Sequence, residues 1–432
     1  MALGGGTWTS QDKVLPGSYI NFVSADKAGI TLSDRGVCAI PMELDWGKDG
    51  EVIKVNAEDV RNVSYRVFGH DYTDEEMLPI REVFRHAKTL YIYRLNSGEK
   101  AANDYATANC SGARGNDLKI AITANVDEPS KFDVVTYLGT VKMDTQTVEK
   151  AADLKANDYV TFKGNATLEA VAGMPLMGGT NGDVTGDTHQ KALDALEAYA
   201  FNALGCPSSD DKIKALYVAY SKRMRDEVGV KFQTIVYDTA ADYIGVINLK
   251  SKVTGEKEQD LVYWLTGAEA GCAVNRSVTN MKYDGEYMVD TPLTQYELKT
   301  AVKNGELVFH KVGNEIHVLE DINSFVTLTS EMGADFQLNQ VIRVLDQVGN
   351  DIASMFNTKY LGKIQNDNSG RISFWNDVVS FFSKMQDIGA IENFDSGEVV
   401  VANGEDKRSV LVTTNCQPVC AMEKLYMTVT VE

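Results

Sequence analysis

The chain has 432 residues, with 42 Lys or Arg against 61 Asp or Glu, giving a formal net charge of −19 at pH 7. Its length favours two or three domains, and its charge argues against nucleic acid or an anionic membrane as a partner. The first residues do not have the pattern of a secretory signal, and no apolar stretch is long enough to span a bilayer. The six cysteines are scattered, which suggests reduced thiols. We therefore expect synthesis in a cytoplasm.

The chain begins with a polar, glycine-bearing stretch that has neither helical nor strand periodicity and leads into a strand-like run at Ser18–Val23. Residues 1–22 are therefore predicted to form an N-terminal arm and a first strand. Residues 23–97 alternate β-rich runs with a helical stretch around Glu75–Ala87. This alternation predicts the N-terminal part of an α/β core.

The pattern changes over residues 98–176, where short runs of apolar residues are separated by Gly, Asn, Asp and Pro. Leu118–Val126, Phe132–Leu138 and Val141–Val148 each predict a strand, and helical periodicity is slight. We interpret this region as an inserted β-rich domain, either a sandwich or a barrel.

Residues 177–325 return to an α/β pattern and open with a glycine-rich turn at Gly178–Gly182. A helix is expected next, with Gly205 closing it and apolar positions at Leu193, Leu196, Ala200 and Ala203. The run Asp211–Val228 predicts a second helix, and Val230–Tyr237 predicts a strand.

The last region, residues 326–432, carries two long amphipathic helices. The first has its apolar stripe between Val341 and Met355, and the second, stopped at Gly389, has its stripe at Ile372, Trp375, Val379, Phe382 and Met385. The chain ends in a run where Leu425, Met427, Val429 and Val431 alternate with Tyr426, Thr428 and Thr430. A terminal strand with one apolar face needs a sheet to join.

These elements predict a mixed α+β or α/β multidomain fold. Its α/β core is built from N- and C-terminal parts of the chain, with an inserted β-sandwich or barrel domain and extended terminal arms.

A search for chemistry yields no catalytic residue, cofactor site or metal site. The turn Gly178–Gly182 could cradle a phosphate, but no P-loop lysine follows it, so we favour a domain-boundary turn. A mixed zinc site from Cys416, Cys420, His310 and His317 would require the fold to unite them, and a pair of buried thiols is favoured. The five histidines have no adjacent nucleophile motif and are interpreted as surface or capping residues.

Several motifs occur in an order that resembles the contractile tail sheath proteins of phages. The run Pro16-Gly17-Ser18-Tyr19-Ile20 is similar to a Pro-Gly-x-Tyr-Ile/Val motif near sheath N-termini. The turn Gly178–Gly182 and the run Ala192–Glu197 are similar to the family's Gly-Gly-x-(Asp/Asn)-Gly turn and Ala-Leu-x-x-Leu-Glu helix. Asp321–Ser324 matches its Asp-Ile-Asn-(Ser/Thr) motif. Each motif is common alone, and their order makes the resemblance specific.

The resemblance implies a structural subunit that polymerises helically around a tail tube and contracts to drive the tube through a target cell envelope. It implies as partners other sheath subunits in six-fold rings, the tail tube protein, and the baseplate and tail terminator proteins, with no nucleic acid and no membrane. The subunit would belong to a virion tail sheath made and assembled in the bacterial host cytoplasm. Neighbours are expected to be linked by strand exchange through arm residues Val14, Tyr19, Ile20, Phe22, Leu425, Tyr426, Met427, Val429 and Val431.

Other interpretations stay open at this point. One is a soluble two-domain α/β enzyme that binds a phosphorylated ligand at Gly178–Gly182, and another is a binding module whose β insertion recognises a cell-surface ligand. The last strand could also pair within its own subunit.

Overall fold

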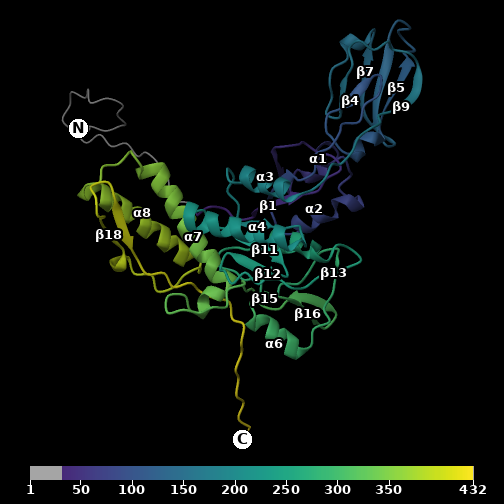
Figure 1. Cartoon of the computed structure of the whole chain (residues 1–432). Helices are drawn as coiled ribbons and strands as arrows, with labels where there is room; N and C mark the ends of the chain where they lie inside the picture. The colour runs from purple at the N-terminus through teal and green to yellow at the C-terminus, as the bar shows by residue number, and fades with distance from the viewer. Residues whose placement is uncertain (1–31, 432) are drawn as a thin grey trace, which may run out of the picture.

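The computed structural model describes residues 32–431 and has a mixed α+β multidomain fold (Figure 1). A central α/β body carries a β domain that projects on one side and a C-terminal lobe of helices on the other. The predicted N-terminal arm, with Val14, Tyr19, Ile20 and Phe22, lies outside the described residues.

A seven-stranded sheet forms the centre of the body, in the order β15-β12-β11-β10-β1-β3-β2. Neighbouring strands are parallel except for the antiparallel pair of β2 and β3. The strands are β1 (Val37–Met42), β2 (Val52–Asn56), β3 (Thr89–Arg94), β10 (Ala203–Gly205), β11 (Gln233–Tyr237), β12 (Val246–Leu249) and β15 (Glu306–Leu307). Cys38 is opposite both Leu90 of β3 and Ala203 of β10, so strands from before and after the β domain are hydrogen-bonded side by side.

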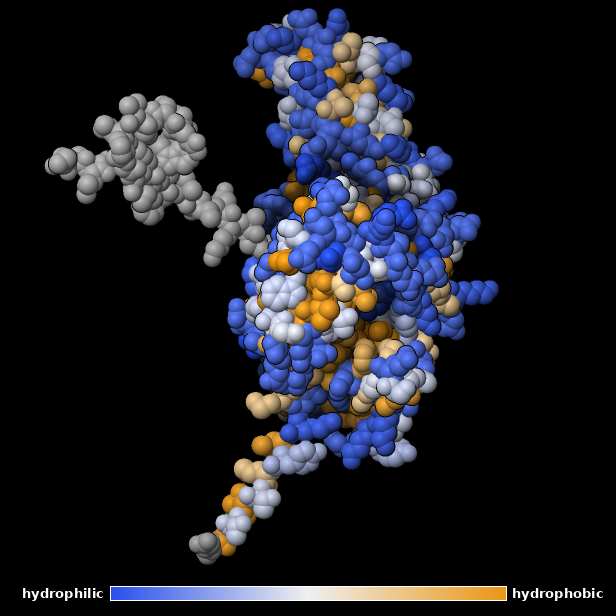
Figure 2. All heavy atoms as spheres, turned by 90° about the vertical axis from the view of Figure 1, so that its left-hand side faces the viewer, coloured by the Kyte–Doolittle hydropathy of each residue, from blue (hydrophilic) through white to orange (hydrophobic). Residues whose placement is uncertain are grey.

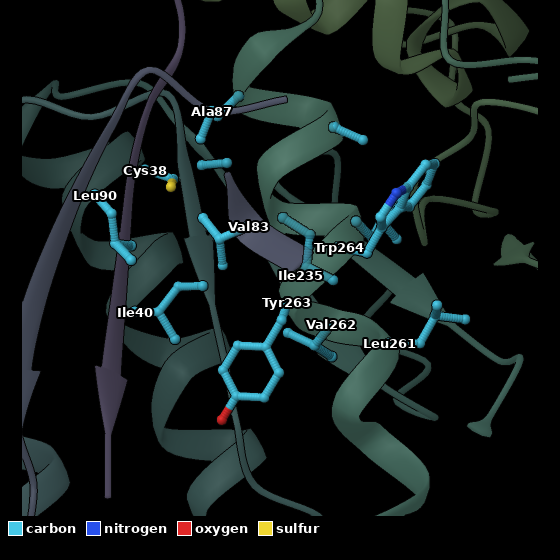
Figure 3. Packing of buried hydrophobic residues seen from close by; sticks show 14 of the residues in the cluster. Cys38, Ile40, Val83, Ala87, Leu90, Ile235, Leu261, Val262, Tyr263 and Trp264 are labelled. Carbon is cyan, nitrogen blue, oxygen red and sulfur yellow. The ribbon is translucent and has the colours of Figure 1, made fainter. Parts of the chain in front are cut away.

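Helices cover both faces of this sheet. One face packs against α1 (Val60–Phe68), α2 (Leu78–Val83) and α5 (Leu261–Gly271), and the other against α3 (Gly186–Leu196) and α4 (Asp211–Lys222), which continues into a π-helical turn at Arg223–Val228. Figure 3 shows Ile40 and Leu90 from the sheet close to Val83 of α2 and Tyr263 of α5. Every residue of α5 from Leu261 to Ala270 is buried, which explains why this helix is apolar all round.

The predicted helix through Ala203 is wrong at its C-terminal end, because α3 stops at Leu196 and Ala203–Gly205 forms strand β10. A strand buried on both faces is a short apolar run, which periodicity cannot separate from a helical turn. Gly205 does not close a helix. It lets α5 approach the sheet, since a Cβ added there would lie 2.7 Å from Thr266 Oγ1.

The inserted region forms a β-sandwich (Figure 1). Its larger sheet has the order β7-β6-β5-β9 and is antiparallel, and a smaller sheet pairs β4 with β8. The strands are β4 (Ala106–Ala108), β5 (Leu118–Ala124), β6 (Phe132–Leu138), β7 (Val141–Val148), β8 (Val160–Phe162) and β9 (Val171–Pro175). Inward-facing side chains such as Ile120 and Val134 meet Ala106 and Val160 in a shared core.

The rest of the body, among the described residues, is built from two short antiparallel strand pairs and one helix. Strand β13 (Val253–Thr254) pairs with β14 (Met288–Val289), and β16 (Phe309–Val312) pairs with β17 (Glu315–Val318). Helix α6 (Gln295–Lys303) begins with a capping box, in which Thr294 and Glu297 satisfy each other's backbone N–H groups.

The C-terminal lobe consists of α7 (Asn339–Met355), a π-helical turn at Phe356–Tyr360, α8 (Asn368–Asp387) and the hairpin β18 (Val400–Asn403) with β19 (Val410–Thr413). The predicted stripe of α8 is partly wrong. The buried side chains are Phe374, Val378, Phe381, Phe382 and Met385, whereas Ile372 is 53% exposed. This helix is apolar over a wide arc, and packing against α7 and the hairpin decides which part is covered.

Helix α7 is held to the body by buried charges. The Arg343 guanidinium of α7, 1% exposed, lies 2.9 Å from Asp321 Oδ2 and 3.1 Å from Glu269 Oε2 of α5. One turn further along α7, Asp346 forms two hydrogen bonds of 2.6 and 2.7 Å with Arg225. Burial, with the neighbouring charge of Asp321, raises the pKa of Glu269 well above its usual range.

Asp321 is the centre of this network. Its carboxylate also accepts hydrogen bonds from the Val278 N–H at 2.9 Å and from Asn339 Nδ2 at 2.8 Å. A buried ion pair need not stabilise a fold relative to an apolar replacement, but removing one partner leaves the other charge buried and unpaired.

We therefore expect Arg343→Met to lower the free energy of unfolding by about 3–5 kcal/mol, because Glu269 and Asp321 lose their shared cation. The control is Arg223→Met, which removes a half-exposed ion pair with Glu197 and should change stability by less than about 1 kcal/mol. Urea unfolding followed by circular dichroism measures both. Equal losses in the two variants would contradict a special role for the buried network.

Candidate subunit-linking site

The chain leaves β19 and runs back along the C-terminal lobe. The Glu392 N–H donates to the Gln417 carbonyl at 3.0 Å, and the Val419 N–H donates to the Ala390 carbonyl at 3.0 Å. These bonds attach residues 417–419 to the loop that follows α8.

The side chain of Gln340, in α7, then forms two hydrogen bonds with the backbone of residues 419–421, which we call the Gln340 clamp. Its Nε2 donates to the Val419 carbonyl at 2.9 Å, and its Oε1 accepts from the Ala421 N–H at 3.0 Å. Gln340 is 5% exposed, so the clamp is built into the protein interior. A last contact joins the Thr279 hydroxyl to Glu423 Oε1 at 2.7 Å.

Beyond Glu423 the chain runs away from the body as an extended segment (Figure 1). We call Leu425–Val431 the C-terminal arm. Its large side chains have exposed fractions of 86% at Leu425, 89% at Tyr426, 74% at Met427, 70% at Val429 and 90% at Val431. Figure 2 shows apolar and paler side chains following one another along it.

Within the part of the chain that the structure describes, the arm makes no strand pairing and no hydrogen bond. Among residues 32–431 the last strand therefore has no pairing partner in its own subunit. The alternating apolar face predicted from sequence is present, but it has no sheet beneath it.

The hairpin of β18 and β19 is the part of the C-terminal lobe suited to receive a strand. It is a two-stranded sheet, so among the described residues each strand has one edge without a neighbour. Val401 and Val412 face each other across the hairpin and pack on the lobe core, while Val400 and Leu411 are 53% and 58% exposed. Figure 2, which faces this lobe, shows apolar side chains gathered on its surface.

The glycine-rich turn at Gly178–Gly182 lies where the chain leaves the β-sandwich region, and it is bonded to residues at the start of that region. The Gly179 N–H donates to Asn116 Oδ1 at 2.8 Å, and the Thr180 N–H donates to the Glu99 carbonyl at 3.1 Å. Because these N–H groups already have partners, they cannot cradle a phosphate. The geometry favours the domain-boundary interpretation over a phosphorylated ligand.

The cysteine and histidine predictions need correction. Cys416 is half-buried and Cys420 is exposed, so they are not a pair of buried thiols. Cys416, Cys420, His310 and His317 do not form a metal-binding group among residues 32–431. Two histidines interpreted as surface residues, His70 and His189, are buried.

His189 faces the Tyr217 hydroxyl at 3.0 Å, and burial lowers the pKa of its imidazole to about 4. Single-sequence patterns miss such residues, because burial of one polar side chain in a helix leaves no periodic signal.

The architecture defines a multidomain structural subunit with a tethered but unpaired C-terminal arm. Four family models match consecutive parts of the chain. They are the tail sheath protein Gp18 domain III N-terminal region at residues 35–95, the phage tail sheath protein beta-sandwich domain at 96–181, its central domain at 182–324 and its C-terminal domain at 331–432.

Individual proteins agree with these models. The phage-like element PBSX protein XkdK of Bacillus subtilis is 33% identical, over 99% of this chain and 100% of that protein. The crystal structure of the sheath tail protein from Desulfitobacterium hafniense has a TM-score of 0.83 and 36% identity, and covers 94% of this chain and 98% of that chain. The sheath tail protein of Listeria innocua has a TM-score of 0.79 and 33% identity, covering 90% of this chain and 93% of that chain.

The chain therefore belongs to the phage tail sheath protein family. This is a family of structural proteins and not of enzymes, and it indicates a component of a virion tail or of a tail-like particle. Among residues 32–431, no helix combines the length and apolar character needed to cross a membrane.

The clamp predicts the behaviour of a point variant. Gln340→Ala removes both side-chain hydrogen bonds to residues 419–421, and each is worth about 1 kcal/mol. We expect amide hydrogen exchange at Ala421 to accelerate roughly tenfold, with unfolding of the whole chain little changed. Gln190→Ala, which removes one bond to Asp194 on the surface of α3, is the control. Unchanged exchange at Ala421 would argue against the clamp.

Proposed function

We propose that this subunit polymerises helically around a tail tube through its terminal arms and contracts to drive the tube through a target cell envelope. The observation that carries the proposal is the C-terminal arm, which is tethered up to Glu423 and then exposes alternating apolar side chains that no strand among residues 32–431 covers. A segment of this kind completes a sheet elsewhere.

The acceptor we propose is the β18–β19 hairpin of a neighbouring subunit. A two-stranded sheet is marginal by itself, and an added strand supplies both ladder hydrogen bonds and side-chain burial. Each large apolar side chain that becomes fully buried contributes about 1.5–3 kcal/mol, so an arm with four of them can link subunits strongly. Val400 and Leu411 would supply apolar contacts on the hairpin's exposed face.

Donor arm and acceptor hairpin are different surfaces of one molecule, so the contact is head-to-tail. Such contacts generate rings where the rotation closes and open helices where it does not. We propose six-fold rings stacked helically, with the tail tube protein inside and the baseplate and tail terminator proteins at the ends. Assembly would take place in the bacterial host cytoplasm, without nucleic acid or membrane as partner.

Contraction, in this proposal, is movement of folded subunits relative to one another while the arms keep neighbours tethered. The buried charges between α7 and the body support it, because they make the body and the C-terminal lobe one unit. The energy would be stored in the assembled packing, with no hydrolysis needed.

We also propose the division into domains that the sequence predicts. It assigns residues 1–22 to an N-terminal arm, 23–97 to the first part of the core, 98–176 to the inserted β domain, 177–325 to the central domain and 326–432 to the C-terminal domain with its exchange strand.

The two faces of the C-terminal arm give a matched test. Met427→Asp places a charge on the apolar face and should abolish tube formation, because the aspartate would be buried without a partner. Thr428→Asp adds the same charge on the opposite face and should assemble. Sedimentation and negative-stain electron microscopy of the concentrated proteins report the result. Equal assembly by both variants would mean that the apolar face is not what neighbours bind.

A second test concerns the N-terminal arm, for which Val14, Tyr19, Ile20 and Phe22 are the proposed linking residues. Deletion of residues 1–20 should stop tube growth while leaving the thermal unfolding midpoint unchanged. A truncated protein that still builds sheath-like tubes under the electron microscope would remove the N-terminal arm from the mechanism.

A further inference from the structure

A large cleft lies in the body, at the carboxyl ends of β1 and β10 and beside α1. Its volume is about 1130 Å³. The cleft is lined by residues of the loops that follow β1 and β10, among them Glu43, Asp45 and Asp210. Further carboxylates come from the turn before α5, including Glu258 and Asp260. Lys257 also lines the cleft, so its walls carry an excess of negative charge, and such an excess raises the local concentration of cations.

His70 lies in the wall of this cleft and is 5% exposed. It follows Gly69, whose left-handed backbone (φ 75°) ends α1 and turns the chain toward the cleft. The Nε2 atom of His70 lies 2.9 and 3.0 Å from the two carboxylate oxygens of Asp45, in the loop after β1. This nitrogen therefore has its partner.

The other ring nitrogen, Nδ1, has no hydrogen-bond partner among residues 32–431. It points instead toward two carboxylates, 3.8 Å from Asp74 Oδ2 and 3.7 Å from Glu76 Oε2. One ligand atom from each of His70, Asp74 and Glu76 lies within 4.8 Å of the other two.

This arrangement brings three acceptors together, and one of them, Asp74 Oδ2, also accepts a hydrogen bond from the Asp71 N–H at 2.8 Å. When Nε2–H donates to Asp45, Nδ1 of a neutral imidazole presents a lone pair to two negative oxygens, and the three repel unless a cation lies between them. A metal ion bound to all three atoms removes this repulsion. Metal-binding histidines usually donate their other ring N–H to a carboxylate, as His70 does to Asp45.

We propose that His70 Nδ1, Asp74 and Glu76 bind one divalent transition-metal ion, with Asp45 as the positioning residue for the imidazole. Tetrahedral Zn²⁺ with bonds near 2.1 Å places its ligand atoms roughly 3.4 Å apart. The separations of 3.8 and 3.7 Å from Nδ1 are close to this value, and the exposed carboxylates of Asp74 and Glu76 can rotate to complete the site. Three protein ligands leave the fourth position to water from the cleft, and the nitrogen and carboxylate donors suit Zn²⁺.

The ion would act on the junction with the β-sandwich. Asp45 accepts at its backbone carbonyl from the Arg114 N–H at 3.2 Å, and Arg114 Nε donates to the Gly69 carbonyl at 2.8 Å. A metal that fixes His70 against Asp45 therefore stiffens the two body loops on which the β-sandwich is mounted. This proposal is independent of the arms and of polymerisation.

The test is a calorimetric titration of the full, tag-free chain with ZnCl₂ after removal of metals with a chelator. We expect one Zn²⁺ per chain and an upward shift of the thermal unfolding midpoint when Zn²⁺ is in excess. Asp74→Asn and Glu76→Gln should weaken the affinity at least tenfold. Both side chains are substantially solvent-exposed, so these variants should fold. Asp45→Asn should weaken binding about 10–100-fold through the imidazole.

Glu75→Gln is the matched control, because Glu75 is the exposed neighbour of Glu76 and is outside the cluster. It should bind Zn²⁺ within twofold of the unchanged protein. The absorption spectrum of bound Co²⁺ distinguishes this site from binding to cysteine thiols. A site of nitrogen and oxygen ligands gives ligand-field bands without a thiolate charge-transfer band. Absence of stoichiometric Zn²⁺ binding, equal affinities for Glu76→Gln and Glu75→Gln, or a cobalt–thiolate band would each overturn the proposal.

Discussion

The placement of the C-terminal lobe in this sheath subunit depends above all on the buried charges around Arg343. Arg343 of α7 lies between Glu269 of α5 and Asp321, and all three are almost fully buried. Because none of these charges can return to water without unfolding the contact, α7 has one position against the body. The same helix carries Gln340, which clamps the C-terminal segment. The network that joins the lobe to the body therefore also determines where the C-terminal arm departs.

Two kinds of attachment follow from this structure. The C-terminal lobe is fixed to the body by charges and helix packing, while the β-sandwich is joined through loops, in which buried Arg94 donates to the Ser111 carbonyl and the Arg114 N–H donates to the Asp45 carbonyl. Gly112 shows how close that junction is, because a Cβ there would lie 1.9 Å from the Asp45 carbonyl oxygen. In the proposed contraction each subunit moves as a unit, and close junctions would transmit that movement where loose ones would absorb it.

Local patterns predicted much of this fold. Phe132–Leu138 and Val141–Val148 are strands with the predicted bounds, because a half-buried strand alternates its side chains with period two. The long helices were found from their apolar spacing. Strand β10 was missed, since a strand buried on both faces has no alternation. The buried face of α8 was misplaced, because two apolar stripes interleave on that helix and only its neighbours select one.

The sequence by itself determined the order of the domains, the β character of the insertion and the alternating apolar face of Leu425–Val431, since all three are written in residues close together in the chain. Only the tertiary structure decided that this arm has no partner among the described strands, and that Asp45, in the loop after β1, meets the His70 imidazole in the wall of the cleft. The physical reason is that both depend on distances between separate elements, and such distances are set by packing and leave no trace in local spacing.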